Sequence, residues 1–294
     1  MKYEVNLKPP RTFDKQIEIL RSRNIIINDK ERARKILSTV NYYRLTGYAL
    51  HIKNDQSYIK GYTIESIFGI YSFDKRMRNI LMDVLEAVEI SMRTSIAYVL
   101  GHKYGPDGYI YSDNFKTGDN NKKYHKKFLE ELEREKRNNK RELFIEHHIN
   151  NYHGILPIWV ATEIMTFGML SRLYANLKTE DRSKIANSFI GVNHKVVESW
   201  LRSLSILRNI CAHYGRLYNR KFNLVPAIHK DLSNYKIEKN KLFANVVAIK
   251  YVLPYKDELD RLMIDLNEAI QKWSRFIDLR LIGFPENWIE ILSK

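Results

Sequence analysis

The segment at positions 208–213, Arg-Asn-Ile-Cys-Ala-His, brings together two side chains that could cleave a phosphodiester. Arginine holds a phosphate through two parallel hydrogen bonds, and histidine exchanges protons near neutral pH. When RNA is cleaved by its own 2′-hydroxyl, a base and an acid move protons and positive charge stabilises the pentacoordinate phosphate. Arg208 and His213 are therefore candidate catalytic residues for cleavage without a metal ion. Asn209 is a third candidate, which would orient the imidazole or the phosphate.

The spacing of these residues favours a site that two chains build together. On an ideal helix Asn209 and His213 lie about 40° apart, whereas Arg208 lies about 140° from His213. Either the helix loosens near His213-Tyr214-Gly215, or a second subunit supplies part of the site. One histidine cannot easily be base and acid in one step, so we predict a homodimer with two facing motif helices. A histidine near a helix C-terminus also interacts favourably with the helix dipole, which is the structural alternative.

The apolar pattern predicts the helices that must position these residues. The motif helix begins at Asn193 or His194, and a longer helix begins at Thr63 and runs to about Leu100. Within the longer helix, Glu89 and Arg93 are expected to form a surface ion pair, since they are four residues apart. Six apolar residues form the buried stripe of the motif helix: Val197, Trp200, Leu201, Leu204, Leu207 and Cys211.

The remaining pattern is helical almost throughout, since 294 residues contain only 12 Gly and 7 Pro. No repeat and no parallel-sheet pattern is present. The other expected elements, in chain order, are helices at 12–22 and 29–39, a turn at 41–48, a loop or short strand within 49–62, a helix at 156–177 with a break at Phe167-Gly168, and a helical bundle from Lys241.

Composition favours a nucleic-acid partner. The formal charge is +15 and the sequence pI is about 9.6, which favours RNA over an anionic membrane surface. The single cysteine, Cys211, excludes an intramolecular disulfide and fits a reducing compartment. The sequence shows neither a signal-peptide pattern nor an apolar run long enough to span a membrane, so we expect a cytoplasmic protein without membrane contact.

Two groups of cations are candidate RNA-binding residues. The polar segment 112–142 is either a solvated helix or an RNA-facing arm. The candidate RNA-binding residues are Lys122, Lys123, Lys126, Lys127, Arg137, Lys140 and Arg141 in the polar segment, and Arg216, Arg220 and Lys221 after the motif.

The sequence shows no metal site. Three histidines, His147, His148 and His153, lack the carboxylates or cysteines that a metal site needs, so we expect no metal and no other cofactor.

Several short blocks resemble one protein family, the Abi-like abortive-infection proteins of bacteria (AbiD and AbiF type) in the HEPN superfamily. The blocks lie in the family's order along most of the chain. They are Asn41–Tyr48, Tyr71–Arg78, Val88–Arg93, Leu156–Val160, Phe167–Ser171, Leu207–His213 and Arg216–Arg220.

The resemblance implies an all-α HEPN-type helical bundle, usually dimeric, with Arg208, Asn209 and His213 at the positions of the family's ribonuclease motif. We expect an N-terminal helical extension at 1–62, a HEPN core at 63–225 and a C-terminal helical extension at 226–294. It also implies RNA cleavage in anti-phage defence or toxicity, and some relatives are encoded beside a structured noncoding RNA. HEPN toxins paired with nucleotidyltransferase antitoxins usually carry a tyrosine two residues after the motif histidine, where this chain has Gly215.

Two other functions remain open. The same basic surface could hold a structured RNA without cutting it, because many HEPN folds bind without catalysis. The chain could also be a protein-interaction scaffold in a defence complex.

Overall fold

The computed structural model describes residue 7 and residues 9–294. Within them the chain forms thirteen α-helices and one hairpin, whose two strands have two residues each. The predicted all-α fold class is confirmed. Two compact units are present, one formed by residues up to 77 with 267–278, the other by residues 78–266 with 279–294. The segment boundaries predicted near residues 62 and 225 stay a prediction.

The first unit begins with the two predicted helices, α1 (Phe13–Ser22) and α2 (Lys30–Thr39), which pack together. Thr12 and Asp29 cap them, each accepting a hydrogen bond from a backbone N–H of the first turn. The hairpin of β1 (Lys53–Asn54) and β2 (Ser57–Tyr58) fills part of the segment whose pattern was ambiguous.

The turn predicted at residues 41–48 is wrong. Helix α3 (Tyr42–Thr46) and the 3₁₀ helix η1 (Gly47–Ile52) occupy this segment. Asn41, a residue typical of turns, caps α3 by accepting a hydrogen bond from the backbone N–H of Tyr43.

Helix α4 (Ile64–Tyr104) is the long helix predicted from Thr63. Thr63 and Ser66 form a reciprocal capping box, in which each side chain accepts a hydrogen bond from the other's backbone N–H. The helix continues past the predicted end at Leu100 and stops before Gly105, which has a positive φ of 82°.

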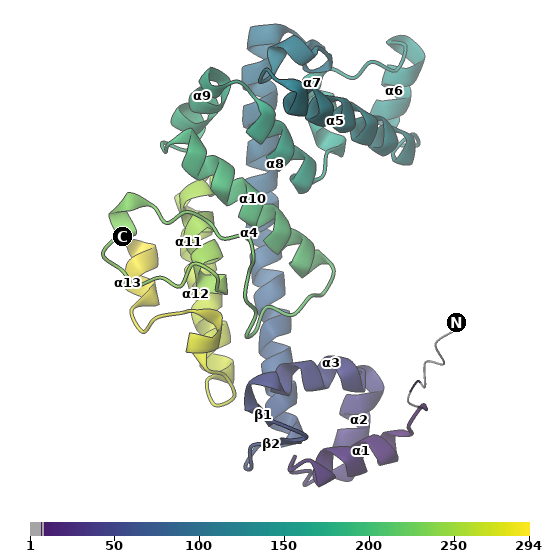
Figure 1. Ribbon diagram of the computed structural model, residues 1–294, viewed down its shortest axis with the longest axis vertical. Helices are drawn as coiled ribbons and strands as arrows, with labels where there is room; N and C mark the ends of the chain where they lie inside the picture. Colours follow the sequence, from purple (N-terminus) through teal and green to yellow (C-terminus); the bar gives the residue numbers. More distant parts are fainter. Residues whose placement is uncertain (1–6, 8) are drawn as a thin grey trace. The chain divides into compact units, whose positions relative to one another are not determined.

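The second unit contains the motif helix and the helices that bury its apolar side. Its N-terminal half comprises α5 (Asp119–Asn138), α6 (Leu143–Asn151), α7 (Ile158–Ala161), α8 (Phe167–Asn176), α9 (Thr179–Phe189) and α10 (His194–Ala212). Helix α10 packs on α8, α9 and α11, and α8 lies between α5 and α10 (Figure 1). The break predicted at Phe167-Gly168 within the 156–177 segment is confirmed, because Thr166 caps a new helix at this point.

The predicted C-terminal bundle is formed by α11 (Leu242–Val252), α12 (Lys256–Trp273) and α13 (Trp288–Ser293). Helix α11 is apolar around most of its circumference, and nine of its eleven residues are buried. A helix of this kind needs neighbours on all sides, so α11 belongs to the core of the unit. Among the described residues, no helix is both long and apolar enough to cross a membrane.

Candidate functional site

Helix α10 presents the motif at its C-terminal end because its apolar stripe is fixed in the core. The six predicted stripe residues are all buried, with relative exposures of 3% or less. Asn193 caps the helix by accepting a hydrogen bond from the N–H of Lys195, and the indole of Trp200 donates one to the carbonyl oxygen of Ala227. The predicted start and stripe of the motif helix are therefore confirmed, and the opposite side of the helix remains available to solvent.

The motif helix ends at His213 in a Schellman motif. The N–H of Gly215 donates to the carbonyl oxygen of Ile210 at 2.7 Å, and the N–H of Tyr214 donates to that of Cys211 at 3.1 Å. Tyr214 has a positive φ of 56°, which costs a side-chain-bearing residue about 1 kcal/mol. The helix thus ends where loosening was expected. His213 keeps φ of −93° and ψ of 19°, so its side chain stays close to its helical direction.

Gly215 is required by close packing. A Cβ atom at this position would lie 2.8 Å from Cγ2 of Ile210 and 3.0 Å from its carbonyl oxygen. The carbonyl oxygen of Gly215 accepts a hydrogen bond from Nη1 of Arg78 on α4, at 3.3 Å. The turn after the motif is therefore fixed both to its own helix and to α4.

Arg208 is attached to α4 through a buried carboxylate. Its Nε lies 3.4 Å from Oε2 of Glu89, and Nη2 of Arg93 lies 2.8 Å from Oε1 of the same carboxylate. Arg93 also donates to the carbonyl oxygen of Met165 at 3.0 Å. The Glu89 side chain is only 7% exposed, whereas Arg208 remains 31% exposed. The buried carboxylate of Glu89 therefore holds two arginines, and one of them, Arg208, is exposed enough to contact a phosphate.

The ion pair predicted between Glu89 and Arg93 is present, but its expected place at the surface is wrong, because Glu89 is buried. Leu85 and Met92, both buried, lie within about 60° of Glu89 on the helix, so its position falls inside the apolar stripe. A carboxylate inside such a stripe needs a cationic partner from another element. This was the available signal that Glu89 belongs to the site.

The structure places Asn209 and His213 on the exposed face of α10 and directs Arg208 toward α4. Both Asn209 and His213 are exposed. Nη1 of Arg208 donates a hydrogen bond to Oδ1 of Asn209 at 3.4 Å, which links the arginine to that face. Within one chain the structure joins Arg208 to Glu89 and Asn209, and it leaves the imidazole of His213 facing solvent.

The candidate RNA-binding residues after the motif divide by burial. Lys221 is exposed, and Arg216 and Arg220 are half-buried. Nη1 of Arg220 donates to the carbonyl oxygen of Arg216 at 3.3 Å, and its guanidinium lies 6.0 Å from the ring centre of Phe222. Lys221 is thus the most accessible cation of this group.

The other candidates lie on α5 and in the loop before α6, and all of them are exposed. Helix α5 buries His125 and Leu132 and carries its charges outward, as a solvated helix does. Both a solvated face and an RNA-facing arm agree with this placement. The residues are Lys122, Lys123, Lys126, Lys127 and Arg137 on α5, and Lys140 and Arg141 in the loop.

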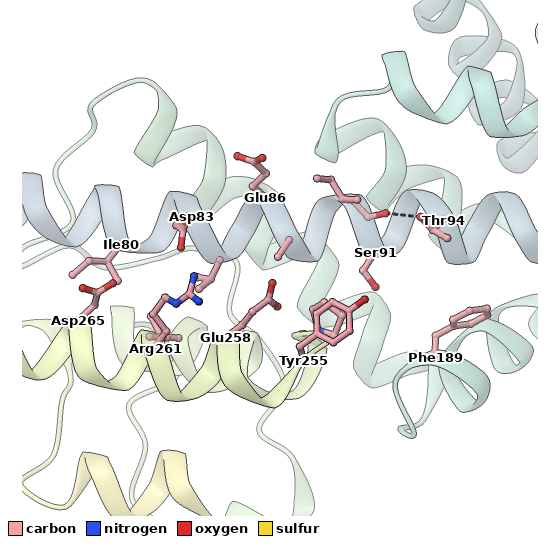
Figure 2. A pocket seen from close by; sticks show the side chains of 15 residues that line it. Ile80, Asp83, Glu86, Ser91, Thr94, Phe189, Tyr255, Glu258, Arg261 and Asp265 are labelled. Atoms are coloured by element: carbon pink, nitrogen blue, oxygen red, sulfur yellow. Dashed lines mark hydrogen bonds between the residues drawn. The ribbon is translucent and has the colours of Figure 1, made fainter.

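A different part of the same unit carries the opposite charge. A pocket of about 500 Å³ lies between α4 and α12, with Phe189 from α9 at one end (Figure 2). Burial, and then the negative charge of Asp257, raises the pKa of Glu258 above its ordinary value. Because this pocket would repel phosphates, we do not assign RNA to it. Its charged lining, which defines the acidic pocket, consists of Asp83, Glu86, Glu258, Asp265 and the single cation Arg261.

Two of the three histidines considered for a metal pack against an aromatic ring instead. His147 and His148 lie with their ring centres 5.6 and 5.3 Å from that of Tyr152. Within the part of the chain that the structure describes, no group of three or more histidine, cysteine, aspartate or glutamate side chains is placed to hold a metal ion.

Comparison with known families gives a match to the Abi-like proteins over residues 35–219, more than half of the chain. The chain belongs to the Abi-like protein family. This confirms the family predicted from the sequence motifs, and membership indicates abortive-infection defence against phage. The matched range includes Glu89 on α4 and the whole of α10 with its motif. No curated protein and no solved structure matches the chain significantly.

Proposed function

We propose that this Abi-like protein is a metal-independent endoribonuclease of the HEPN type that acts in abortive infection. The observation that carries the proposal is the arrangement around Arg208. A buried carboxylate holds this guanidinium while 31% of the side chain stays exposed, and His213 is exposed at the end of the same helix. A fixed cation beside a titratable group is the minimum that phosphodiester cleavage requires.

In the proposed reaction the 2′-oxygen of RNA attacks the adjacent phosphorus and the bond from phosphorus to the 5′-oxygen breaks. One imidazole accepts the 2′-hydroxyl proton, an acid protonates the departing 5′-oxygen, and Arg208 stabilises the charge on the phosphorane. The products carry a 2′,3′-cyclic phosphate and a 5′-hydroxyl. DNA lacks the 2′-hydroxyl and is inert in this reaction.

The proposal includes a homodimer in which two motif helices face each other. Within one chain Arg208 is held toward α4, and His213 is exposed at the end of α10. A two-fold axis beside α10 would set the His213 of one chain near the Arg208 of the other and supply both a base and an acid.

Purified protein incubated with end-labelled RNA in the presence of EDTA tests the reaction. We expect cleavage that leaves cyclic-phosphate ends, its loss in His213→Ala, and no action on DNA of the same sequence. Cleavage that EDTA abolishes, or that His213→Ala retains at full rate, would contradict the proposed chemistry.

Mixing inactive Arg208→Ala chains with inactive His213→Ala chains tests the shared site. If each site draws residues from both chains, heterodimers regain part of the activity or the mutant chains inhibit the wild type. A monomer that cuts RNA at the full rate would refute the shared site and leave the ribonuclease assignment intact.

The second candidate is a noncatalytic module that holds a structured RNA. The exposed lysines of α5 favour it, because they offer phosphate contacts away from the motif. RNA binding without any cleavage, unchanged by His213→Ala, would establish this function in place of the ribonuclease.

A further inference from the structure

The exposed face of α10 continues beyond the motif toward its N-terminal half. On an ideal helix Arg202, Asn209 and His213 fall within about 40° of one another. All three are exposed. Arg202 therefore lies on the same line as the candidate catalytic residues, about 16 Å from His213 along the helix axis.

Arg202 opens into a pocket that α5, α8 and α10 build together. This pocket has a volume of about 350 Å³, and a second one that shares Arg202 and Glu198 extends it along α10 to Lys195 and Ser199. A third, smaller hollow shares Tyr124 and Arg172 and reaches Lys127 on α5. Figure 1 shows α8 lying between α5 and α10, as the packing of these helices requires. We call the connected hollows the α5–α8–α10 groove.

The side chains of this groove are of the types that bind a nucleic-acid strand. Tyr124 is 60% exposed and offers a ring on which a base can stack. Arg172, 53% exposed, and Arg202 offer guanidinium groups to phosphates. Asn121 and Ser171 add hydrogen-bonding groups that can contact base edges or sugars.

The two carboxylates in the groove are each paired with an arginine. Glu131 accepts a hydrogen bond from Arg172, and Glu198 accepts one from Arg182, whose side chain is 7% exposed. Paired carboxylates repel a strand less than lone ones, because the neighbouring cation offsets their charge. The groove therefore differs from the acidic pocket, where four carboxylates face one arginine.

We infer that the α5–α8–α10 groove binds the single-stranded part of an RNA whose reacting phosphate lies farther along α10, at His213. Tyr124 stacks on an unpaired base, and Arg172 and Arg202 hold phosphates on either side of it. The inference rests on the proposed RNA substrate. It adds that the substrate is single-stranded at the groove, since a duplex offers no unstacked base to Tyr124.

Among the predicted lysines of α5, the groove is lined by Lys127 alone in the hollows described above. Lys127 lies about 60° from Tyr124 around the helix and lines the groove. Lys122 and Lys126 lie about 160° from Tyr124, on the opposite side of α5. Lys126 and Lys127 are both exposed and adjacent in sequence, so they form a matched pair for a test.

The test measures binding of a labelled single-stranded oligoribonucleotide, and of a duplex of the same sequence, to protein carrying His213→Ala. We expect Tyr124→Ala and Arg202→Ala each to weaken single-strand binding about tenfold. Lys127→Ala should weaken it more than Lys126→Ala, and single-stranded RNA should bind more tightly than the duplex. Because these side chains are exposed, thermal denaturation should show an unchanged fold.

Equal effects of Lys126→Ala and Lys127→Ala, together with wild-type affinity in Tyr124→Ala and Arg202→Ala, would overturn the inference. Preference for the duplex, or no RNA binding at all, would also overturn it. These readings are independent of cleavage, because the His213→Ala background removes the proposed chemistry. A protein that binds RNA in the groove and never cuts it would refute the ribonuclease and leave the groove intact.

Discussion

The exposed face of α10 and the acidic pocket belong to one compact unit and carry opposite charge. The first joins Arg202 to the motif residues Asn209 and His213, and the second gathers four carboxylates around Arg261. A net charge of +15 describes neither surface. An anionic ligand is attracted by one and repelled by the other, so the distribution of charge, and not its sum, favours the proposed RNA site.

Two glutamates show the same difference at the level of single atoms. Glu89 is buried and both of its oxygens face arginines. Oε2 of Glu258 is buried and has no hydrogen-bond partner, and burial and nearby acids raise the pKa of this carboxyl. Pairing of both oxygens makes the Glu89 carboxylate a fixed anchor for cations, whereas the one buried oxygen of Glu258 that lacks a partner adds a cost to stability.

We expect the largest change in the rate of RNA cleavage from substitutions in the motif, and no change from substitutions in the acidic pocket. Arg208→Ala and His213→Ala should each reduce RNA cleavage by about 1,000-fold or more, because each removes a group that acts on the reacting phosphate. Asn209→Ala should cost less, since its expected role is orientation. Asp83→Ala and Glu86→Ala are the matched variants in the acidic pocket and should cut RNA at the wild-type rate. Equal loss in the two sets would remove the functional contrast between the surfaces.

Glu89→Gln should lower the cleavage rate by up to about 100-fold, because Arg208 loses the charge that holds its guanidinium in place. A double-mutant cycle with Arg208→Ala measures this coupling. If Glu89 acts by positioning Arg208, Glu89→Gln adds little further loss in the Arg208→Ala background. Independent, multiplying losses would instead assign Glu89 a general role in stability.

The salt dependence of RNA binding should also distinguish the exposed face of α10 from the acidic pocket. RNA affinity should fall steeply with salt, and loss of one phosphate contact, as in Arg202→Ala, should reduce the slope of log K against log salt by about 0.7. The slope should stay unchanged in Glu86→Gln, because that side chain lines the acidic pocket. Titrations at several salt concentrations check both values, and an affinity independent of salt would contradict the assignment of cations to phosphates.

The smallest effect concerns stability and pH. The folded-state pKa of Glu258 is raised, so the folded protein binds this proton more tightly than the unfolded chain does. Stability therefore falls as pH rises through the folded pKa, and the penalty is absent below the unfolded pKa. Glu258→Gln should raise the melting temperature at neutral pH by about 1–2 °C and lose this advantage in acid. Melting curves that differ equally at every pH would contradict the assigned cause.

The sequence predicted α10 well and the site around Arg208 poorly. A cap at Asn193 and six stripe residues at helical spacing define α10 by local rules alone. The burial of Glu89 depends on Arg208, a residue far along the chain on a different helix, and spacing within α4 suggests Arg93 as its only partner. Contacts between distant elements carry no local signature, so the carboxylate could be recognised as unusual but not assigned its second partner.

Sequence patterns also gave a wrong prediction where one residue type favours both a turn and a helix cap. Asn41 favours turns and helix caps for the same reason, since its side chain bonds nearby backbone groups, and here it caps α3. The break predicted at Phe167-Gly168 is confirmed, in contrast, because Thr166 caps α8 directly before it. These boundaries depend on which of two local hydrogen-bonding patterns the surrounding packing selects.

The contact between Gly215 and Ile210 restricts how this end of the motif can evolve. Any side chain at position 215 would press against Ile210, so a tyrosine there requires a smaller residue at position 210 or a rebuilt turn. With this turn geometry, glycine at position 215 can therefore be replaced only together with a second change, at position 210 or in the turn itself.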